Sequence, residues 1–393
     1  MIGINECNTG IAGVAKQHLD GVKLRVCQNI DFYIGIFEYL ESIAGKHIPD
    51  SAVQAKVQSL KTLYRCDHCK SLLNHFLKDG SKIANVNGYH LIKPAANRKS
   101  AVNNLPAVLS ALKELKKRYV VLMTMDFNNN VVRNENVYQA IKKRCVDSVY
   151  LQEKIFDYDW FTKLAADKPW GPYQLTTAIG LSCCPYCNRQ YTFTISVVGG
   201  KKVARPQLDH FLPQKYHPLL ALSFYNLIPS CAVCNASIKG SANTSYKTHI
   251  SPYLLNPKHA LMRFSYRPQS YTASVGLTDD VIIDLKYNGD PTDSNLKKKV
   301  DGNIGMFFLE KLYENHKDEV RDIIFKRKQT NDQYLKMTQK TFRRLNLTEA
   351  DAYRIAYGKF FEEIDFYRRP LSKLTKDIAY ELGALIDFPI NNP

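Results

Sequence analysis

Two Cys-x2-Cys pairs in the middle of the chain, each called a knuckle below, have the residue types and spacing of a metal site. Four thiolates complete a tetrahedral Zn²⁺ site and leave no coordination position for a substrate, so the predicted zinc is structural. Residues 188–230 separate the knuckles, a longer interval than in compact four-cysteine ribbons, and a functional insert is expected there. The expected Zn²⁺ ligands are Cys184, Cys187, Cys231 and Cys234.

Two alternatives to this ligand set stay open. Cys183 directly precedes Cys184 and could replace it as a ligand. Only Cys184 has the two-residue gap to Cys187, filled by Pro185 and Tyr186, that turns a knuckle. The other alternative to zinc is two unrelated pairs of buried free cysteines.

The insert between the knuckles contains side chains suited to the hydrolysis of phosphodiester bonds. Asp209 is an oxygen donor suited to Mg²⁺ or Mn²⁺, and the adjacent His210 can act as general base from the opposite side of an extended backbone. Asn235, directly after the last cysteine, offers the cation a second oxygen without adding charge. Mg²⁺ commonly keeps several waters, so two protein ligands suffice. Asn226 is expected to bond the loop backbone and hold His210 in position.

Further polar residues near this insert are candidates for substrate contacts. Lys239 could contact phosphate near the cation, although an exposed lysine at the end of a helix explains it equally well. Arg205 and Lys215 flank the Asp-His loop and could hold the substrate backbone. His217 and His249 could also reach the site, His249 as part of the cation shell, but hydrogen-bonded structural histidines are the expectation for both.

A second cysteine pair lies nearer the start of the chain. Cys66-Asp67-His68-Cys69, with His75, could form another zinc site. The pair falls within an expected helix, residues 52–78, and no distant partner pair has the matching spacing. We therefore expect these cysteines to pack on a helix.

The charge of the chain favours a polyanionic partner. Its 54 Lys and Arg residues outnumber 37 Asp and Glu residues, for a net charge of +17. Nucleic acid is the commonest partner of such a protein, and a merely soluble basic protein is the alternative. No secretory signal or membrane-spanning run is apparent, and paired Cys-x2-Cys spacing favours metal thiolates in a reducing compartment, so a cytoplasmic protein with no membrane partner is expected.

The elements expected to position these residues give an α+β fold. Residues 191–198 read as a strand with Tyr191 and Phe193 in the core, Gly199-Gly200 as a turn, and residues 201–208 as the antiparallel return. The Asp-His pair would end that second strand, and a helix would begin near Ser230–Cys231. Closer to the N-terminus, residues 106–118 read as a helix and the apolar run 119–125 as a buried strand.

The length of 393 residues predicts two or three domains. Residues 1–150 carry no motif with obvious chemistry and read as mixed helices and strands, residues 151–255 hold the candidate site, and residues 256–393 read as short strands followed by a helical domain that could bind substrate or partner. Basic residues on these last helices are candidate phosphate contacts or a solvated face. They are Lys326-Arg327-Lys328, Arg343-Arg344 and Arg368-Arg369.

In this order, Asp209-His210, Asn226-Leu227, Cys234-Asn235 and Lys239-Gly240 resemble the HNH endonucleases, the ββα-metal or His-Me finger nucleases, in their zinc-containing form. The resemblance implies that Asp209 and Asn235 bind the catalytic cation, His210 is the base and Asn226 braces the loop. It also implies a ββα-metal module and cleavage that leaves a 5′ phosphate and a 3′ hydroxyl. Asn235 stands where the last residue of the motif is often histidine. The resemblance does not extend to residues 1–150.

More loosely, residues 184–188, 208–213 and 225–231 look like HNH proteins of bacterial defence islands, including those of Septu-type and retron-linked systems. This resemblance implies an anti-phage effector with DNA as the favoured substrate. It also implies a partner ATPase, since this chain has no nucleotide-binding motif of its own. An RNA endonuclease, for example one that cuts tRNA, and a non-catalytic zinc-containing nucleic-acid-binding protein are the alternatives.

Overall fold

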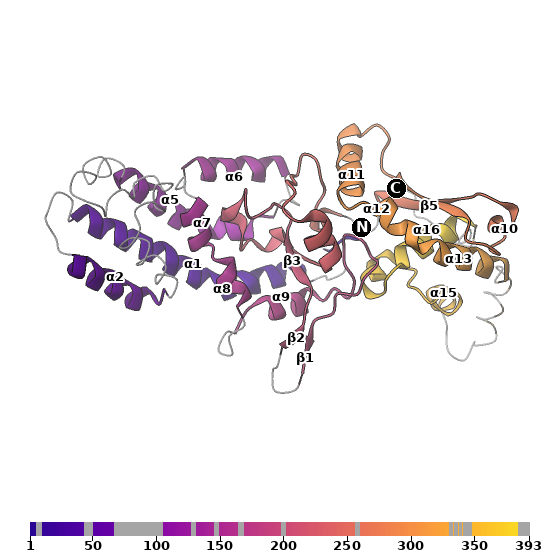
Figure 1. Cartoon of the computed structure of the whole chain (residues 1–393), viewed down its shortest axis with the longest axis horizontal. Helices are drawn as coiled ribbons and strands as arrows, with labels where there is room; N and C mark the ends of the chain where they lie inside the picture. The colour runs from indigo at the N-terminus through magenta and orange to yellow at the C-terminus, as the bar shows by residue number, and fades with distance from the viewer. Residues whose placement is uncertain are drawn as a thin grey trace. The chain divides into compact units, whose positions relative to one another are not determined.

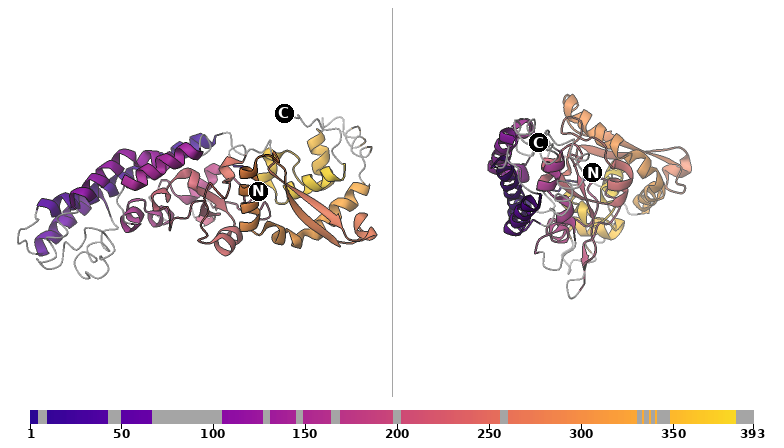
Figure 2. Two further views of the ribbon diagram at one scale, coloured as in Figure 1. Left: turned by 90° about the horizontal axis from the view of Figure 1, so that it is seen from above. Right: turned by 60° about the vertical axis from the view of Figure 1, so that its left-hand side comes forward.

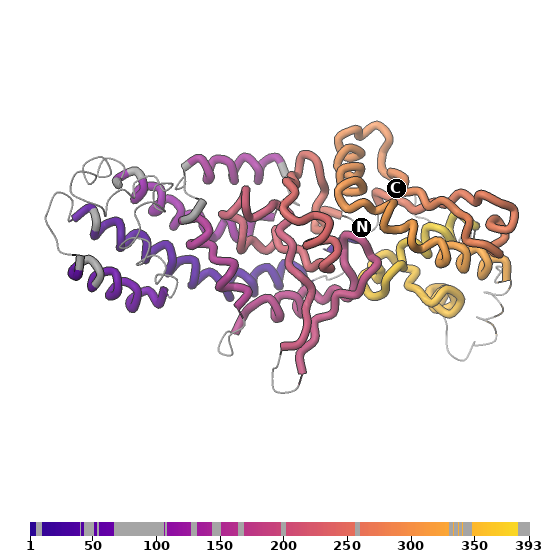
Figure 3. Tube along the Cα trace, in the orientation of Figure 1, coloured from indigo at the N-terminus to yellow at the C-terminus, as the bar shows by residue number. Residues whose placement is uncertain are grey.

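A computed structural model describes two compact units in the chain (Figure 3). The first unit comprises residues 1–11, 176–211 and 228–393, and the second comprises residues 12–175 and 212–227. Segment 151–255 contributes to both units. The described residues are 1–4, 10–42, 50–66, 105–126, 131–144, 149–163, 169–197, 202–255, 260–329, 333, 337, 340 and 348–383.

Helices make up most of the described part of the second unit (Figure 1). Its helices α1 and α5 are joined by an ion pair of Glu38 with Lys113, in which the carboxylate oxygen and the ammonium nitrogen lie 2.9 Å apart. Leu60 of α2 faces Gly35 of α1. The elements are α1 (Ile11–Ser42), α2 (Asp50–Tyr64), α5 (Leu105–Thr124), α6 (Val131–Arg144), α7 (Val149–Ile155), α8 (Tyr158–Thr162), η2 (Pro218–Leu220) and η3 (Phe224–Asn226).

One face of α1 contributes to the core of the second unit. Val22, Val26, Ile30, Tyr33 and Phe37 are buried and recur every three or four residues along the helix. This is the period of an α-helix, so these side chains form one continuous apolar stripe. The stripe is the local sequence signal that specifies which side of α1 faces inward.

Residues 119–125 are not the buried strand expected from their apolar run. All but the last of them continue α5, which ends at Thr124. Leu115 and Leu122 are fully buried at helical spacing, whereas Val121 is 45% exposed. A short apolar run suits a strand and a buried helix equally, and here the helical stripe that begins earlier in α5 continues through it.

The strands of the first unit form small sheets. β1 (Ile195–Ser196) pairs with β2 (Lys202–Ala204), β3 (Gln207–His210) with β4 (Leu227–Ser230), and β5 (Met262–Pro268) with β6 (Val281–Tyr287). The β1–β2 and β5–β6 pairs are antiparallel. Along β6 the buried side chains alternate with exposed or half-buried ones, as expected for a strand with one face on the core.

Helices pack around the β5–β6 sheet (Figure 2). α16 contacts β5, and α13 contacts both α16 and β6. The buried rings of Phe264 on β5 and Tyr313 on α12 have centroids 4.3 Å apart. The helices and turns of this unit are α9 (Pro172–Ile179), η4 (Val233–Lys239), η5 (Pro252–Leu254), α10 (Tyr271–Ser274), α11 (Ser294–Met306), α12 (Leu309–Tyr313), η6 (Glu314–His316), α13 (Lys317–Gln329), α15 (Glu349–Tyr357), η8 (Glu363–Arg368) and α16 (Ser372–Glu381).

The hairpin expected over residues 191–208 is shorter than predicted. β2 ends at Ala204, and Pro206 follows, which has no N–H group for a strand ladder. The chain then forms β3, which pairs with β4 and not with β1. The Asp-His pair therefore lies on a strand beside β4, although it had been expected on the return strand of the hairpin.

Tyr191 and Phe193 are not core residues, contrary to the expectation from their strand pattern. Their side chains are 50% and 48% exposed, and their rings stack with centroids 4.6 Å apart. Tyr191 is held by an isolated bridge with Cys183, and Phe193 precedes β1, so neither lies in one of the described sheets. A β-branched and aromatic pattern predicts a strand without revealing whether anything covers it.

The described residues confirm a mixed α+β fold in which helices predominate. Within that part of the chain, no helix is both long enough and apolar enough to cross a bilayer.

Candidate functional site

The two knuckles meet in space. The sulfur atoms of Cys184, Cys187, Cys231 and Cys234 all lie within 4.8 Å of one another, and all four residues are buried. Zn–S bonds of about 2.3 Å in a tetrahedral site place sulfurs roughly 3.8 Å apart, so this group fits Zn²⁺. The structure thus brings together the predicted ligands as a cluster that could bind zinc.

Backbone amides support these sulfurs. The N–H of Arg189 donates to the Cys187 sulfur and the N–H of Cys234 to the Cys231 sulfur, each at 3.4 Å. Such bonds stabilise a thiolate, the form that binds metal.

Cys183 is not part of the cluster, which settles the choice between it and Cys184. It is fully buried and forms an isolated β-bridge with Tyr191. Burial, and then the nearby Cys187, raise the pKa of Cys183 to about 12, so it remains a neutral thiol. Cys183 is therefore a small residue of the hydrophobic core.

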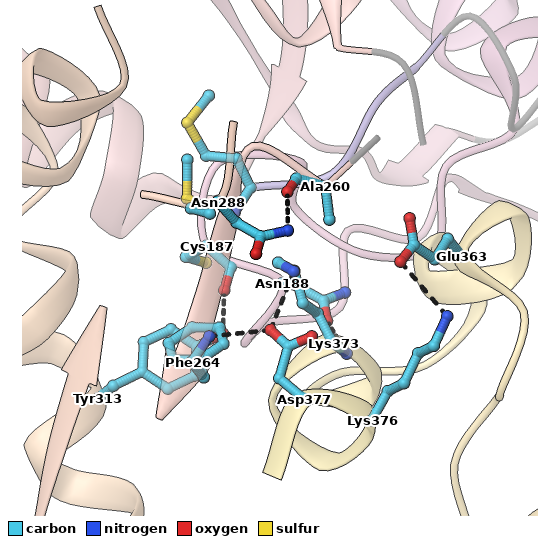
Figure 4. Close-up of polar contacts among 12 residues, drawn as sticks. Cys187, Asn188, Ala260, Phe264, Asn288, Tyr313, Glu363, Lys373, Lys376 and Asp377 are labelled. Atoms are coloured by element: carbon cyan, nitrogen blue, oxygen red, sulfur yellow. Dashed lines mark hydrogen bonds and ion pairs between the residues drawn. The ribbon is translucent and has the colours of Figure 1, made fainter. Parts of the chain in front are cut away.

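The residue after the first knuckle attaches that knuckle to the C-terminal helices (Figure 4). Asn188 has φ +48°, a left-handed conformation that asparagine tolerates. Its Nδ2 donates to the Phe366 carbonyl at 2.8 Å, and its Oδ1 accepts from the Lys373 N–H at 3.2 Å. The Tyr313 hydroxyl donates to the Cys187 carbonyl at 2.5 Å. These bonds fix the first knuckle on η8, α12 and α16.

A buried ion pair lies beside this attachment in α16 (Figure 4). Lys373 Nζ lies 2.9 Å from Asp377 Oδ2, and the same oxygen accepts from the Phe264 N–H at 2.9 Å. Both charged side chains are buried. The pair connects α16 to β5.

Asp209 on β3 is buried and bonded at both carboxylate oxygens. Lys239 Nζ donates to Oδ1 at 2.8 Å, and the Tyr186 hydroxyl donates to Oδ2 at 2.6 Å. Burial, followed by the charge of Asp209, raises the pKa of Tyr186 well above its ordinary value. The hydroxyl therefore keeps its proton and donates a hydrogen bond to Asp209. The Tyr186 ring stacks on Phe307 with centroids 4.2 Å apart.

His210 follows Asp209 on the same strand. Successive side chains of a strand alternate between its faces, so His210 and Asp209 point to opposite sides of β3. His210 is half-buried, and its carbonyl accepts a hydrogen bond from Lys239 Nζ at 2.6 Å. The predicted role of His210 as a base stays a prediction.

Asn235 on η4 has a different partner from Asp209. Its Nδ2 donates to Gln207 Oε1 at 2.9 Å. Gln207 precedes Asp209 by two residues, so the two share a face of β3. Asp209 is already neutralised by an ammonium group, so its contacts do not fit a divalent cation. The bond of Asn235 uses the nitrogen of its amide and not the oxygen that a cation would bind, and its ligand role stays a prediction. The predicted helix carrying Asn235 and Lys239 is present as the π-helix η4.

Asn226 braces a loop within the second unit. Its Oδ1 accepts from the Leu212 N–H at 2.7 Å, and its Nδ2 donates to the Leu212 and Leu220 carbonyls, each at 3.1 Å. The side chain is 2% exposed. These are the loop-backbone bonds expected of Asn226, and its influence on His210 stays a prediction.

The three cations expected to contact substrate differ in location. Lys239 is not at the surface: its side chain is 1% exposed, because it forms the ion pair with Asp209. Arg205 is half-buried and donates to the Pro206 carbonyl at 2.8 Å. Lys215 is exposed, with its ammonium 5.5 Å from the centre of the Tyr216 ring.

His217 and His249 both have structural partners. His217 Nδ1 lies 3.1 Å from the Tyr138 hydroxyl, and burial, then Lys142, lower its pKa to about 4. His249 Nδ1 lies 2.8 Å from Thr248 Oγ1, and burial, then the charge of Lys239, lower its pKa. Both contacts agree with the expectation of hydrogen-bonded histidines.

Three of the basic residues on the C-terminal helices, Arg327, Arg368 and Arg369, have partners within the protein. Arg327 donates to the carbonyls of Leu382 and Gly383, just after α16. The guanidinium groups of Arg368 and Arg369 lie over the Phe360 ring, at 4.5 and 5.4 Å from its centre. Arg343-Arg344 lies outside the described residues.

The second cysteine pair is described only in part. Cys66 lies just beyond α2, and its thiol donates to Asn29 Oδ1 at 3.3 Å. Cys69, His68 and His75 lie outside the described residues, so the second zinc site stays untested.

Sequence reasoning missed Tyr186 and Gln207. Tyr186 had been considered only as a turn residue of the first knuckle, yet its hydroxyl reaches Asp209. The signal for Gln207 was its position two residues before Asp209, which places both on one face of a strand. No local signal predicted which side chain would bond Tyr186, because Asp209 lies beyond the knuckle in sequence.

Comparison with known proteins yields one partial similarity. Over 60 residues the chain is 33% identical to the Septu protein PtuB of Bacillus thuringiensis. The aligned segment is 15% of this chain and 23% of PtuB, so the chain matches less than a quarter of that relative's length. No protein-family model matches the chain, and no solved structure matches it.

Proposed function

We propose that this chain is a zinc-stabilised HNH-type endonuclease that acts in anti-phage defence and hydrolyses DNA. The observation that carries the proposal is the convergence of two knuckles, separated by residues 188–230, on the strand that bears Asp209 and His210. Tyr186 comes from the first knuckle, and Lys239 ends the helix that contains Cys234. A zinc cluster that clamps an Asp-His dipeptide is a rigid support for a reacting imidazole.

In the proposed reaction His210 is the general base. Its imidazole accepts a proton from water as the water oxygen forms a bond to phosphorus and the P–O3′ bond breaks. The departing 3′ oxygen takes a proton from solvent, and His210 then returns its own proton to solvent. The products carry a 5′ phosphate and a 3′ hydroxyl. Asn226 supports this step indirectly, since its bonds to Leu212 shape the loop that follows His210 in the sequence. Arg205 and Lys215 are the proposed contacts to the substrate backbone.

The proposed reaction uses no divalent cation bound by Asp209 and Asn235. Both oxygens of Asp209 accept hydrogen bonds, one of them from an ammonium group. The cleavage assay therefore compares Mg²⁺, Mn²⁺ and EDTA to test whether a divalent cation is required.

The similarity to the Septu protein PtuB supports the defence role. The choice of DNA rests on the resemblance of the Asp-His, Asn226 and Asn235 residues to the HNH endonucleases. We further propose an ATPase partner that controls the nuclease. Phage plating on cells that carry this chain with its neighbouring genes tests this role. Protection is expected with the wild-type chain and is expected to be lost with His210→Ala.

Cleavage is tested with purified, zinc-loaded protein, plasmid DNA and total RNA, each with Mg²⁺, Mn²⁺ or EDTA. His210→Ala is expected to lower the rate of plasmid cleavage at least about 100-fold while zinc content stays at one per chain. Unchanged cleavage in this variant would remove His210 as the base. Cleavage of RNA alone would favour the RNA endonuclease.

A second candidate function is zinc-dependent binding of nucleic acid without catalysis. The ion pair of Asp209 with Lys239 favours it, because a buried, neutralised carboxylate is what a structural residue requires. Binding of plasmid with no cleavage under any cation, in the presence of the neighbouring gene products, would select this candidate.

A further inference from the structure

Both carboxylate oxygens of Asp209 are bonded by side chains from the two halves of the zinc cluster. Oδ1 accepts from Lys239 Nζ at 2.8 Å and Oδ2 from the Tyr186 hydroxyl at 2.6 Å. Tyr186 lies inside the first knuckle, and Lys239 ends η4, which contains Cys234 of the second. The cluster therefore holds Asp209 through both knuckles.

Because Asp209 and Lys239 are buried, water does not screen the charges of their side chains. The side chain of Asp209 is 2% exposed and that of Lys239 is 1% exposed. A carboxylate removed from water needs a positive partner at hydrogen-bond distance. Lys239 supplies one full charge, and the resulting neutral pair leaves little net charge to attract a further cation.

A divalent ion on Asp209 would compete directly with this ammonium. Mg²⁺ binds a carboxylate oxygen at about 2.1 Å, close to the place where Nζ lies, and like charges repel strongly in a buried site. Nζ also donates to the His210 carbonyl at 2.6 Å. Displacing Lys239 would therefore release the backbone of the proposed base as well as the carboxylate.

We propose that Lys239 is a positioning residue that serves as the built-in cation of Asp209, in place of a divalent ion, and that it fixes the backbone of His210. The replacement of a divalent ion by the ammonium stands on the contacts of Asp209. Only the role of His210 rests on the function proposed above. Asp209 and Lys239 together thus act on the reaction through the placement of β3.

Binding of Mn²⁺ to zinc-loaded protein, followed by electron paramagnetic resonance, tests the proposal without any cleavage assay. Wild type and Asp209→Asn are expected to bind Mn²⁺ equally, within about twofold, or not at all, because Asp209 is not a ligand. Asp377→Asn is the matched control, since Asp377 forms a comparable buried pair with Lys373 at 2.9 Å. A loss of tenfold or more in Asp209→Asn alone, with zinc retained, would overturn the proposal.

Exchange of one cation for another gives a readout that a merely structural lysine would not produce. Lys239→Met removes the ammonium and keeps the length of the side chain. Mn²⁺ is expected to raise the thermal midpoint of this variant by several degrees and to leave wild type and the double variant Asp209→Asn/Lys239→Met unchanged. An equal Mn²⁺ response in wild type and Lys239→Met would contradict the proposal.

If Lys239→Met does not fold, the comparison of Mn²⁺ affinity between wild type and Asp209→Asn tests the proposal by itself. Failure of the wild-type protein to cleave plasmid or RNA in the presence of the neighbouring gene products would overturn the proposed function. That failure would leave the Mn²⁺ affinities and thermal midpoints as expected here, so the two proposals can fail separately.

Discussion

The side chain of Asn226 bonds both the N–H and the carbonyl of Leu212, so one buried amide group satisfies both backbone polar groups of a single residue. Asn303 does the same for Ile250 in the first unit. A side-chain amide is suited to this because it carries a donor and an acceptor side by side. The loop that follows His210 thus begins with a fixed backbone.

Asn226→Asp is predicted to destabilise the protein by about 3 kcal/mol. The carboxylate keeps the acceptor for the Leu212 N–H but faces the Leu212 and Leu220 carbonyls with no donor, and it buries a charge. Urea unfolding measures the loss. Asn295→Asp is the control, because Asn295 is exposed in the first turn of α11, where negative charge is favourable. An equal effect of both changes would contradict the brace.

The zinc cluster predicts opposite outcomes for two adjacent cysteines. Cys184→Ala is expected to lose the metal, because three thiolates remain, and to lower the free energy of unfolding by several kcal/mol. Cys183→Ala is expected to retain one zinc per chain and to lose about 1 kcal/mol from the small cavity. Elemental analysis and thermal unfolding measure both. Zinc loss in Cys183→Ala but not in Cys184→Ala would reverse the ligand assignment.

Gly276 is predicted to tolerate no side chain. It has φ +78°, and a Cβ atom would lie 2.5 Å from the backbone nitrogen of Phe325 in α13. Gly276→Ala should cost about 3 kcal/mol from the left-handed conformation and the forced shift of α13. Gly305→Ala is the control: nothing lies within 4 Å of its Cβ position, and alanine there should stabilise α11 by up to about 1 kcal/mol. Equal unfolding midpoints would refute the predicted contact.

His18 is predicted to make stability depend on pH. It is fully buried, accepts from Trp170 Nε1 at Nδ1 and lies 2.9 Å from the Leu222 carbonyl through Nε2, as a neutral ring would. Burial lowers its pKa from 6.5 to about 4, against the upward effect of the Leu222 bond. Between these pH values the unfolded chain binds the extra proton. The free energy of unfolding should therefore fall by about 1.4 kcal/mol per unit as pH drops from 6.5 towards 4.

Urea unfolding of wild type and His18→Gln at several pH values between 7.5 and 4.5 measures this contribution. The variant will be less stable throughout, so the slopes are compared and not the values. The slope of its free energy of unfolding against pH is expected to be smaller by about 1.4 kcal/mol per pH unit, which corresponds to one proton. Identical slopes would show that His18 does not titrate with the lowered pKa.

The tertiary structure decided whether several apolar patterns are covered. The run 119–125 suited a strand, but the stripe of Leu115 and Leu122 continues α5 through it. Tyr191 and Phe193 had the pattern of core residues, yet they are half exposed and precede strand β1. Local pattern fixes the period of an element, while coverage depends on segments distant in sequence.

From the sequence alone the four clustered cysteines could be predicted, because two residues between cysteines allow each knuckle to close locally whatever the rest of the chain does. The position of Asp209 and His210 side by side on a strand could be predicted as well. Only the tertiary structure decided that Lys239 lies buried on Asp209. A lysine has a long flexible stem that serves equally well at a surface or in a buried pair, and the choice follows from where η4 packs on β3.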